Sequence, residues 1–115
     1  VKDRDVLALM MRQDSTYFPP GTAYRYSNTG YAVLAMVIEK VSDLSYADFV
    51  CQNIFEPLGM TQTVAYEKGI STVPNRAFGY TVEGDSILFT DQSTYSAVLG
   101  DGGIYSSIHD SFKWD

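Results

Sequence analysis

Three consecutive residues, Tyr26, Ser27 and Asn28, combine side chains that could take part in chemistry. They offer a phenol, a hydroxyl and an amide at one polar turn, directly before the apolar run from Ala32 to Ile38. Side-chain oxygens of Ser and Asn accept hydrogen bonds from the unpaired amides of a first helical turn, so Ser27 and Asn28 are both expected to cap a helix that begins here. Polar groups on a turn that a rigid element positions are typical of a functional loop. This turn is the first candidate for a site.

The helix after this turn is predicted over about residues 29–42 and is apolar on almost every side. Its apolar residues at helical spacing are Tyr31, Leu34, Ala35, Ile38 and Val41, and Val33, Met36 and Val37 fill the other faces. A helix without a polar face is expected to be buried. Asp43 is expected to end it in the left-handed conformation, which Asp adopts more readily than most residues.

The other elements are predicted from caps, breakers and periodicity. The predicted helices cover residues 3–13, capped by Asp3 or Asp5, a stretch from the cap Ser45 to Pro57, and a last helix that starts after Ser107. Pro20 and Gly21 predict a turn, which leads into an extended segment at 22–26. Residues 61–75 are expected to be irregular, and 91–103 to form a loop. Strands are predicted at 77–82 and 86–90, joined by the three-residue loop Glu83-Gly84-Asp85.

Other reactive residue types in the chain favour structural roles. Cys51 lies in an apolar helical pattern and is expected to be a small core residue. His109 follows a cap serine and is expected to be solvated, and one His with one distant Cys cannot form an ordinary metal set. The segment Gly100-Asp101-Gly102-Gly103 is either a tight turn or a place of close backbone approach beside a cleft, and the sequence leaves both open.

Composition bounds the class of protein. The 115 residues are one domain's worth, with 45% hydrophobic and 19% charged residues, which is typical of a globular chain. The net charge of −6 argues against nucleic acid, whose binding depends on neutralising phosphates. No apolar run approaches the roughly 20 residues that cross a bilayer, and no signal peptide is recognisable. The chain begins at Val1 and stops within the last predicted helix, so we expect an internal piece of a larger protein.

Five segments, taken in order, carry a family resemblance. They are Phe18-Pro19-Pro20-Gly21-Thr22, Tyr24-Arg25-Tyr26-Ser27-Asn28-Thr29-Gly30-Tyr31, Ile38-Glu39-Lys40-Val41-Ser42, Ile54-Phe55-Glu56-Pro57-Leu58-Gly59-Met60, and Gly100-Asp101-Gly102-Gly103-Ile104-Tyr105-Ser106-Ser107 with Asp110 behind it. Over nearly its whole length the chain resembles the serine β-lactamase and penicillin-binding protein family, in particular its class C β-lactamase, D-alanyl-D-alanine carboxypeptidase and esterase branch. The resemblance implies an α+β fold, in which residues 1–115 form the mostly helical middle region of a β-lactamase/transpeptidase-like domain with one β-hairpin.

The resemblance also implies roles at the turn. In such enzymes a Ser-x-x-Lys serine attacks the substrate carbonyl, and a Tyr-x-Asn turn lines one wall of the cleft. Tyr26 would then be the general base, which accepts the serine proton and relays it to the leaving group. A free phenol has a pKa of about 10, so this role requires nearby lysines. Asn28 would hold the catalytic lysine and the substrate amide carbonyl, and Ser27 would be a cap or solvent-facing residue rather than the nucleophile.

The sequence departs from the family pattern in two places. None of its serines is followed three residues later by lysine, and it has no Lys-Thr-Gly or His-x-Gly. We therefore expect the Ser-x-x-Lys region and the final sheet strands to lie outside this chain, which alone should be inactive. The resemblance implies no cofactor, a small-molecule or peptidoglycan-like peptide substrate, and a bacterial envelope, secreted or cytoplasmic location. With the covering sheet absent, exposed apolar surface should make the chain self-associate.

Two other interpretations remain open. The chain could belong to a non-catalytic binding or sensor protein that keeps the fold without the nucleophile, which the upstream sequence would reveal. It could instead be a free-standing helical interaction module, which a two-state thermal transition at low concentration would favour. The choice among β-lactam, peptide and ester substrates depends on groups largely outside these residues.

Overall fold

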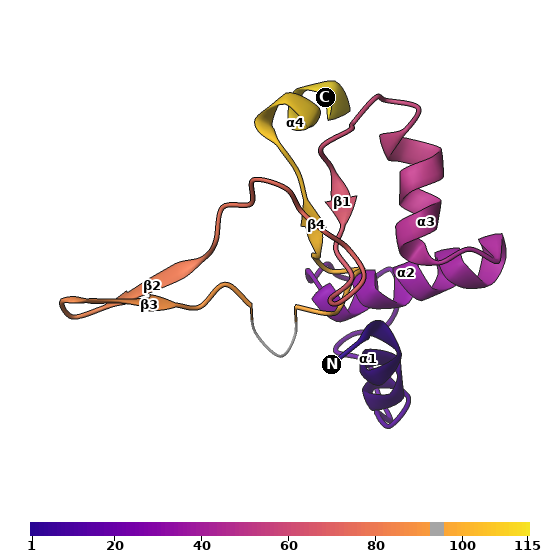
Figure 1. Cartoon of the computed structure of the whole chain (residues 1–115). Helices are drawn as coiled ribbons and strands as arrows, with labels where there is room; N and C mark the ends of the chain where they lie inside the picture. The colour runs from indigo at the N-terminus through magenta and orange to yellow at the C-terminus, as the bar shows by residue number, and fades with distance from the viewer. Residues whose placement is uncertain (93–95) are drawn as a thin grey trace.

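The chain is arranged around one long helix, α2, which packs against α1 and α3 (Figure 1). The computed structural model describes residues 1–92 and 96–115. In chain order its elements are α1 (Asp3–Met10), α2 (Asn28–Ser42), α3 (Tyr46–Val50), the π-helical segment η1 (Cys51–Phe55), β1 (Val64–Ala65), β2 (Tyr80–Glu83), β3 (Ser86–Phe89), β4 (Ile104–Tyr105) and α4 (Ile108–Trp114). Helices together with short antiparallel strands confirm the predicted α+β class.

Helix α2 begins and ends close to the predicted positions. The hydroxyl of Ser27 accepts a hydrogen bond from the Gly30 amide at 3.0 Å, so Ser27 is the N-cap and Asn28 is the first helical residue. The expectation that Asn28 also caps the helix is therefore wrong. At the other end Asp43 adopts the predicted left-handed conformation, with φ of 57°, and its amide donates to the Glu39 carbonyl.

The prediction that α2 is buried is wrong for this chain. Only Ala32 and Ala35 are buried within it, whereas Leu34 and Val37 are about half exposed and Val41 is 80% exposed. The other elements cover the side that carries the two alanines and leave most of the apolar circumference open. The apolar pattern indicates a helix that favours burial, but among the described residues none covers Leu34, Val37 and Val41.

Helix α1 is shorter than predicted, because it ends at Met10 rather than at residue 13. Its N-cap is Lys2, so the prediction that Asp3 or Asp5 caps it is wrong. The Asp5 carboxylate instead accepts from the Lys2 amide at 2.8 Å, which is one half of a capping box. The Asp3 carboxylate is engaged elsewhere, as described below.

A small core lies where α3 and η1 meet β1. Ser45 caps α3 as predicted, with its hydroxyl accepting from the Asp48 amide at 3.0 Å. The helix then widens into a π turn, in which the Glu56 amide donates to the Cys51 carbonyl at 2.9 Å, and it ends at Phe55, two residues before Pro57. The buried members of this core are Val50, Phe55, Met60 and Ala65.

Two separate two-stranded sheets complete the fold. In the first, β1 pairs antiparallel with β4, with Val64 opposite Tyr105. The region 61–75 is irregular as predicted, apart from the short strand β1, which the sequence did not predict. A two-residue strand shows no alternation that a sequence pattern could detect.

The second sheet is the predicted hairpin, with a tighter loop. Pairing of Glu83 with Ser86 leaves Gly84 and Asp85 as a two-residue loop, so the predicted three-residue loop is wrong. Gly84 has φ of 59°, as required at the first central position of a type II′ turn. Of the predicted loop 91–103, residues 93–95 lie outside the described part of the chain.

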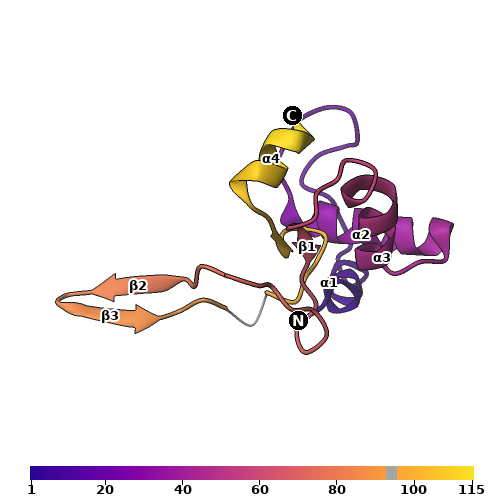
Figure 2. The same cartoon turned by 45° about the horizontal axis from the view of Figure 1, so that its top comes forward.

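The hairpin projects far from the helices, as Figure 2 shows. The radius of gyration is 16.6 Å, compared with about 13 Å for a compact chain of similar length. All eight residues of β2 and β3 are exposed. The helices and the β1–β4 sheet therefore form the body that positions the candidate site, and the hairpin is an arm attached to it.

Candidate functional site

The turn at Tyr26, Ser27 and Asn28 lies at the N-terminus of α2 and is held from within. Ser27 is extended, with φ of −144° and ψ of 106°, and its carbonyl accepts from the Tyr31 amide at 3.3 Å. The Tyr26 ring lies against the Tyr31 ring, with centroids 5.5 Å apart and planes inclined by 39°. The cap and the ring contact together fix where the turn leaves the helix.

The two predicted site residues both face solvent. Tyr26 is 60% exposed and Asn28 is exposed as well. Among residues 1–92 and 96–115, no hydrogen bond engages the Tyr26 hydroxyl or the Asn28 amide group. The structure therefore leaves an exposed phenol and an exposed amide two residues apart at the N-terminus of α2, with their polar atoms available to a bound molecule.

The segment that leads to the turn has its own supports. Gly21 has φ of 79°, which confirms the predicted Pro-Gly turn, and the Thr22 hydroxyl donates to the Pro19 carbonyl at 2.6 Å. The Arg25 guanidinium lies 3.9 Å from the centroid of the Tyr17 ring. These contacts are local in sequence, so they orient the extended segment without help from the rest of the fold.

Gly100 makes a close backbone contact behind the turn. A Cβ atom on this residue would lie 2.4 Å from the Tyr31 carbonyl oxygen, 2.7 Å from the Ala32 Cα and 2.8 Å from the Ala35 Cβ. The backbone at residue 100 therefore rests directly on the first half of α2. Both interpretations that the sequence left open agree with the structure in part, because residues 100 and 101 lie in a turn and Gly100 also makes the close backbone approach.

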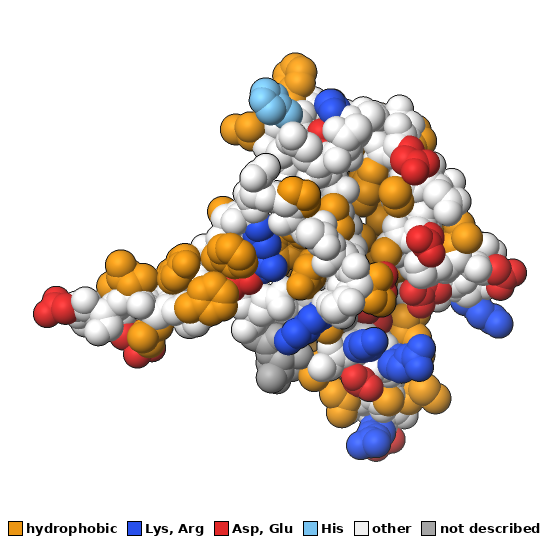
Figure 3. All heavy atoms as spheres, in the orientation of Figure 1, with side chains coloured by type: hydrophobic (Ala, Val, Ile, Leu, Met, Phe, Trp, Pro, Cys, Tyr) orange, Lys and Arg blue, Asp and Glu red, His pale blue; other side chains and the backbone are white. Residues whose placement is uncertain are grey.

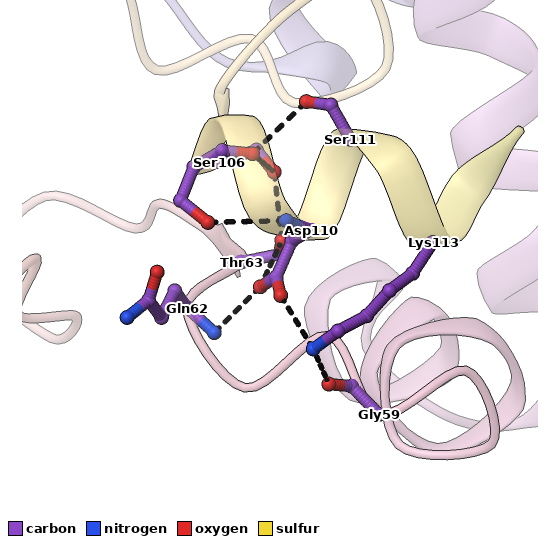
Figure 4. Close-up of polar contacts among 8 residues, drawn as sticks. Gly59, Gln62, Thr63, Ser106, Asp110, Ser111 and Lys113 are labelled. Atoms are coloured by element: carbon purple, nitrogen blue, oxygen red, sulfur yellow. Dashed lines mark hydrogen bonds and ion pairs between the residues drawn. The ribbon is translucent and has the colours of Figure 1, made fainter.

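Asp110 forms a buried polar centre that lies apart from the turn, and Figure 4 shows it. Its carboxylate is 1% exposed and accepts from the Gln62 amide at 2.6 Å, from the Thr63 hydroxyl at 2.9 Å and from Lys113 Nζ at 2.9 Å. Lys113 also donates to the Gly59 carbonyl. Ser107 caps α4 as predicted. Asp110 therefore anchors this helix to the segment that precedes β1, which is a structural role.

The protonation of Asp110 reflects two opposing effects. Burial raises the pKa of its carboxyl group, but the hydrogen bonds from Lys113, the Gln62 amide and Thr63 outweigh burial and leave the pKa below its ordinary value. The native state therefore favours the carboxylate more strongly than the unfolded state does.

This shift predicts acid sensitivity. For a depressed pKa, the stabilisation is fully present above the ordinary pKa of about 4 and is lost as the pH falls through the native value. Melting temperatures measured from pH 7 to pH 3 should fall in the acidic part of this range. In Asp110→Asn the melting temperature should be lower at pH 7 and the deficit should narrow below about pH 4. A deficit that stays constant over this range would contradict the prediction.

A second buried charge holds the base of the hairpin. Arg76 forms an ion pair with Asp91, and the two side chains are 11% and 9% exposed. Arg76 also donates to the Tyr105 hydroxyl at 2.7 Å and lies 4.4 Å from the centroid of that ring. Asp91 accepts from the Gly79 amide at 2.8 Å. These contacts join both ends of the hairpin to β4.

The other two reactive side chains, Cys51 and His109, lie where the sequence predicts. Cys51 is half-buried against the core, as predicted, and burial and the neighbouring Glu56 raise the pKa of its thiol. His109 is exposed, as predicted. Within the described ranges, no three His, Cys, Asp or Glu side chains lie close enough to hold a metal ion. No helix in those ranges has the length and hydropathy needed to span a membrane.

Sequence reasoning missed the contacts that join distant segments. Arg76 lies between the predicted irregular region 61–75 and the predicted strand 77–82 and was assigned no role, Asp91 was given no partner, and Asp110 was considered only as part of a motif. The short apolar and aromatic residues around Arg76 carry no recognisable spacing. The one weak signal in the sequence is an Arg followed closely by the aromatic residues Phe78 and Tyr80.

Comparisons with known proteins identify relatives of this chain in both sequence and fold. The chain is 35% identical to penicillin-binding protein 4* of Bacillus subtilis, an alignment that covers 98% of this chain and 28% of that protein. It is 34% identical to the D-aminopeptidase of Brucella canis, over 93% of this chain and 20% of that protein. Its fold is similar to that of the octameric penicillin-binding protein homologue from Pyrococcus abyssi, with a TM-score of 0.84 and 29% identity over 98% of this chain and 25% of that one.

The relatives are longer than this chain, and a family model matches it. The chain spans about a quarter of the length of the relatives that it matches. Residues 2–115 match the family described as Beta-lactamase, which is nearly the whole sequence. The chain belongs to the Beta-lactamase family.

Proposed function

We propose that the chain is the middle region of the catalytic domain of a serine hydrolase, which cleaves an amide, β-lactam or ester bond through an acyl-enzyme. The observation that carries this proposal is the turn itself. In a chain of the Beta-lactamase family, Tyr26 and Asn28 stand exposed on a capped helix N-terminus with their polar atoms unengaged by any described residue. The relatives named as a penicillin-binding protein and a D-aminopeptidase support an amide as the first substrate to test.

Tyr26 would be the general base of the reaction. Its phenolate oxygen accepts the proton of the nucleophilic serine hydroxyl while the serine oxygen forms a bond to the substrate carbonyl carbon. The same proton then passes to the leaving nitrogen as the C–N bond breaks, which leaves the acyl-enzyme. Water repeats the sequence and releases the acid. The serine and its lysine come from a Ser-x-x-Lys segment that this sequence lacks, so the chain contributes one wall of the cleft.

Asn28 would position the substrate. Its side-chain amide has one acceptor and two donor hydrogens, so it can bind the substrate amide and a lysine ammonium together. Ser27 is occupied as the N-cap through its bond to the Gly30 amide, so it is not proposed to act on the substrate. These roles divide three adjacent side chains between chemistry and structure.

The missing nucleophile gives a direct test. The isolated chain, incubated with a fluorescent penicillin and separated on a denaturing gel, should carry no covalent label. A full-length protein that contains the chain, treated in parallel, should be labelled once per active site and should lose the label when the Ser-x-x-Lys serine is replaced with Ala. A stoichiometric adduct on the isolated chain would refute the proposal that the nucleophilic serine lies outside this chain.

We further propose that the isolated chain self-associates through the projecting hairpin. Opposite residues of an antiparallel pair share a face, so Tyr80 with Phe89 and Val82 with Ile87 form one apolar face. All four side chains are more than half exposed, and Figure 3 shows hydrophobic side chains along this arm. A two-stranded hairpin is marginal alone in water, so pairing with a second copy would stabilise it.

Light scattering over a concentration series should therefore give a mass above that of the monomer. Ile87→Lys places a charge on the apolar face and should shift the mass toward the monomer. Ser86→Lys is the matched control, because its neighbouring position on the opposite face should leave association unchanged. A monomer throughout the series, up to roughly millimolar chain, would contradict the proposal.

A further inference from the structure

The Asp3 carboxylate bonds to a segment almost a hundred residues away. One oxygen accepts from the Leu99 amide and the other from the Gly100 amide, each at 3.0 Å. Acidic residues are common in the first turn of a helix because they favour the unpaired amides there. Asp3 does not serve α1 in that way, since Lys2 is the N-cap and Asp5 makes the reciprocal bond. Its carboxylate instead holds two backbone amides of another segment.

Those two amides lie where the backbone meets α2. Gly100 rests on the Tyr31 carbonyl and on Ala32 and Ala35, so closely that no side chain could replace its hydrogen. Ala32, Ala35 and Val98 are buried at this contact. The segment Val98–Gly100 is therefore held between the start of α1 and the first half of α2.

This contact is one helical turn from the candidate site. Tyr31 follows Asn28 by three residues on the same helix, and its ring packs against Tyr26. Closely packed backbone transmits displacement, because it has no flexible side chain to absorb it. A shift of Val98–Gly100 would therefore move the first turn of α2 and the Tyr26 ring with it.

The Asp3 carboxylate also lies near two other ionisable groups, Asp101 and Tyr46. Burial and the charge of Asp3 raise the pKa of the Asp101 carboxyl, and burial and the same charge raise the pKa of the Tyr46 phenol. The Asp3 charge thus lies near a second carboxyl in a partly buried place. Two amide hydrogen bonds to a carboxylate offset this repulsion.

We propose that Asp3 is a positioning residue for the reaction, because its carboxylate clamps Leu99 and Gly100 onto α2 and so fixes the Tyr26–Asn28 turn. The inference rests on the proposed function of that turn. Asp3 touches no reacting atom and acts through the backbone of residue 100.

The test compares two aspartates of the same helical turn in the full-length enzyme. Asp3→Ala removes the clamp. Asp5→Ala is the matched control, since it removes an equal charge from the same turn but takes away a bond to the Lys2 amide instead. We expect Asp3→Ala to lower kcat by about 10–100-fold with little change in KM, as for a misplaced catalytic group. Asp5→Ala should leave kcat near that of the parent, and Asp3→Asn, which keeps one acceptor oxygen, should restore part of it.

Hydrogen exchange of the Leu99 and Gly100 amides tests the clamp independently of activity. In Asp3→Ala, the Leu99 and Gly100 amides should exchange faster, while in Asp5→Ala they should keep their protection. Melting curves show whether each variant folds, and if Asp3→Ala does not fold, Asp3→Asn is used in its place. If the Leu99 and Gly100 amides kept their protection in Asp3→Ala, the clamp would be refuted. If they lost their protection but kcat fell no more than in Asp5→Ala, the positioning role would be refuted. Tyr26→Phe is measured in the same assay. If Tyr26→Phe kept full activity, the proposed function itself would be refuted. If Tyr26→Phe were inactive while Asp3→Ala kept the kcat of the parent, only the role of Asp3 would be refuted.

Discussion

Tyr26→Phe in the full-length enzyme is expected to lower kcat by roughly 10²–10⁴-fold, the usual contribution of a positioned general acid or base. The change removes one hydroxyl and leaves the ring in place against Tyr31, 5.5 Å away, so the turn should keep its shape. The hydroxyl makes no hydrogen bond to any residue in the described ranges, so its loss should not destabilise the fold. Steady-state kinetics on one amide and one β-lactam substrate, with melting curves, would measure both effects.

Neighbouring variants separate chemistry from capping. Ser27→Ala removes the acceptor of the Gly30 amide and should cost about 1 kcal/mol of stability with little kinetic effect. Asn28→Ala should do the reverse, weakening substrate binding while leaving stability nearly unchanged, because Asn28 is not the cap. If Tyr26→Phe retained near-full activity while Ser27→Ala abolished it, the assignment of roles would be wrong.

Arg76→Ala should reduce the free energy of unfolding by about 3–5 kcal/mol, as expected when one partner of a buried ion pair is removed. Asp91 is 9% exposed and would remain charged and buried without its cation. The Tyr105 hydroxyl would also lose its donor. Denaturant unfolding, followed through the single tryptophan, Trp114, would measure the loss.

Two companion variants test the reason for this loss. Arg25→Ala is the matched control, since Arg25 also stacks on a tyrosine ring but lies at the exposed surface, where such contacts contribute about 0.5–1 kcal/mol. Arg76→Met combined with Asp91→Asn removes both charges, and the Asn oxygen can still accept from the Gly79 amide. This pair should recover most of the stability. A double variant as unstable as Arg76→Ala would show that the uncompensated charge is not the cause.

Features that depend on neighbours within a few residues were predictable from the sequence. The caps at Ser27, Ser45 and Ser107 and the left-handed end at Asp43 follow from bonds that span three or four positions. The adjacency of Tyr26 and Asn28 is equally local, so the sequence by itself determined that these two side chains lie at the same turn. The start of α1 was predicted less accurately, because its N-cap is Lys2, a residue whose side chain gives no capping signal in the sequence.

The exposure of α2 could not be predicted from its composition. The apolar pattern shows that the helix favours burial, but how much of its surface is buried depends on which other segments pack against it. In this chain, Val98–Gly100 covers the Ala32 and Ala35 side, while Val41 remains open. Only the tertiary structure decided this, because the covering segment lies some sixty residues away from the helix.

The side-chain contacts that hold the fold together are also distant in sequence. Asp3 and Gly100 are 97 residues apart, Thr63 and Asp110 are 47 apart, and Arg76 and Tyr105 are 29 apart. A carboxylate in a first helical turn looks the same in sequence whether it caps its own helix or binds another segment. The sequence therefore determined the local conformation and chemistry of the turn, and the tertiary structure alone decided what stands behind it, because pairing across such separations leaves no periodic or short-range signal.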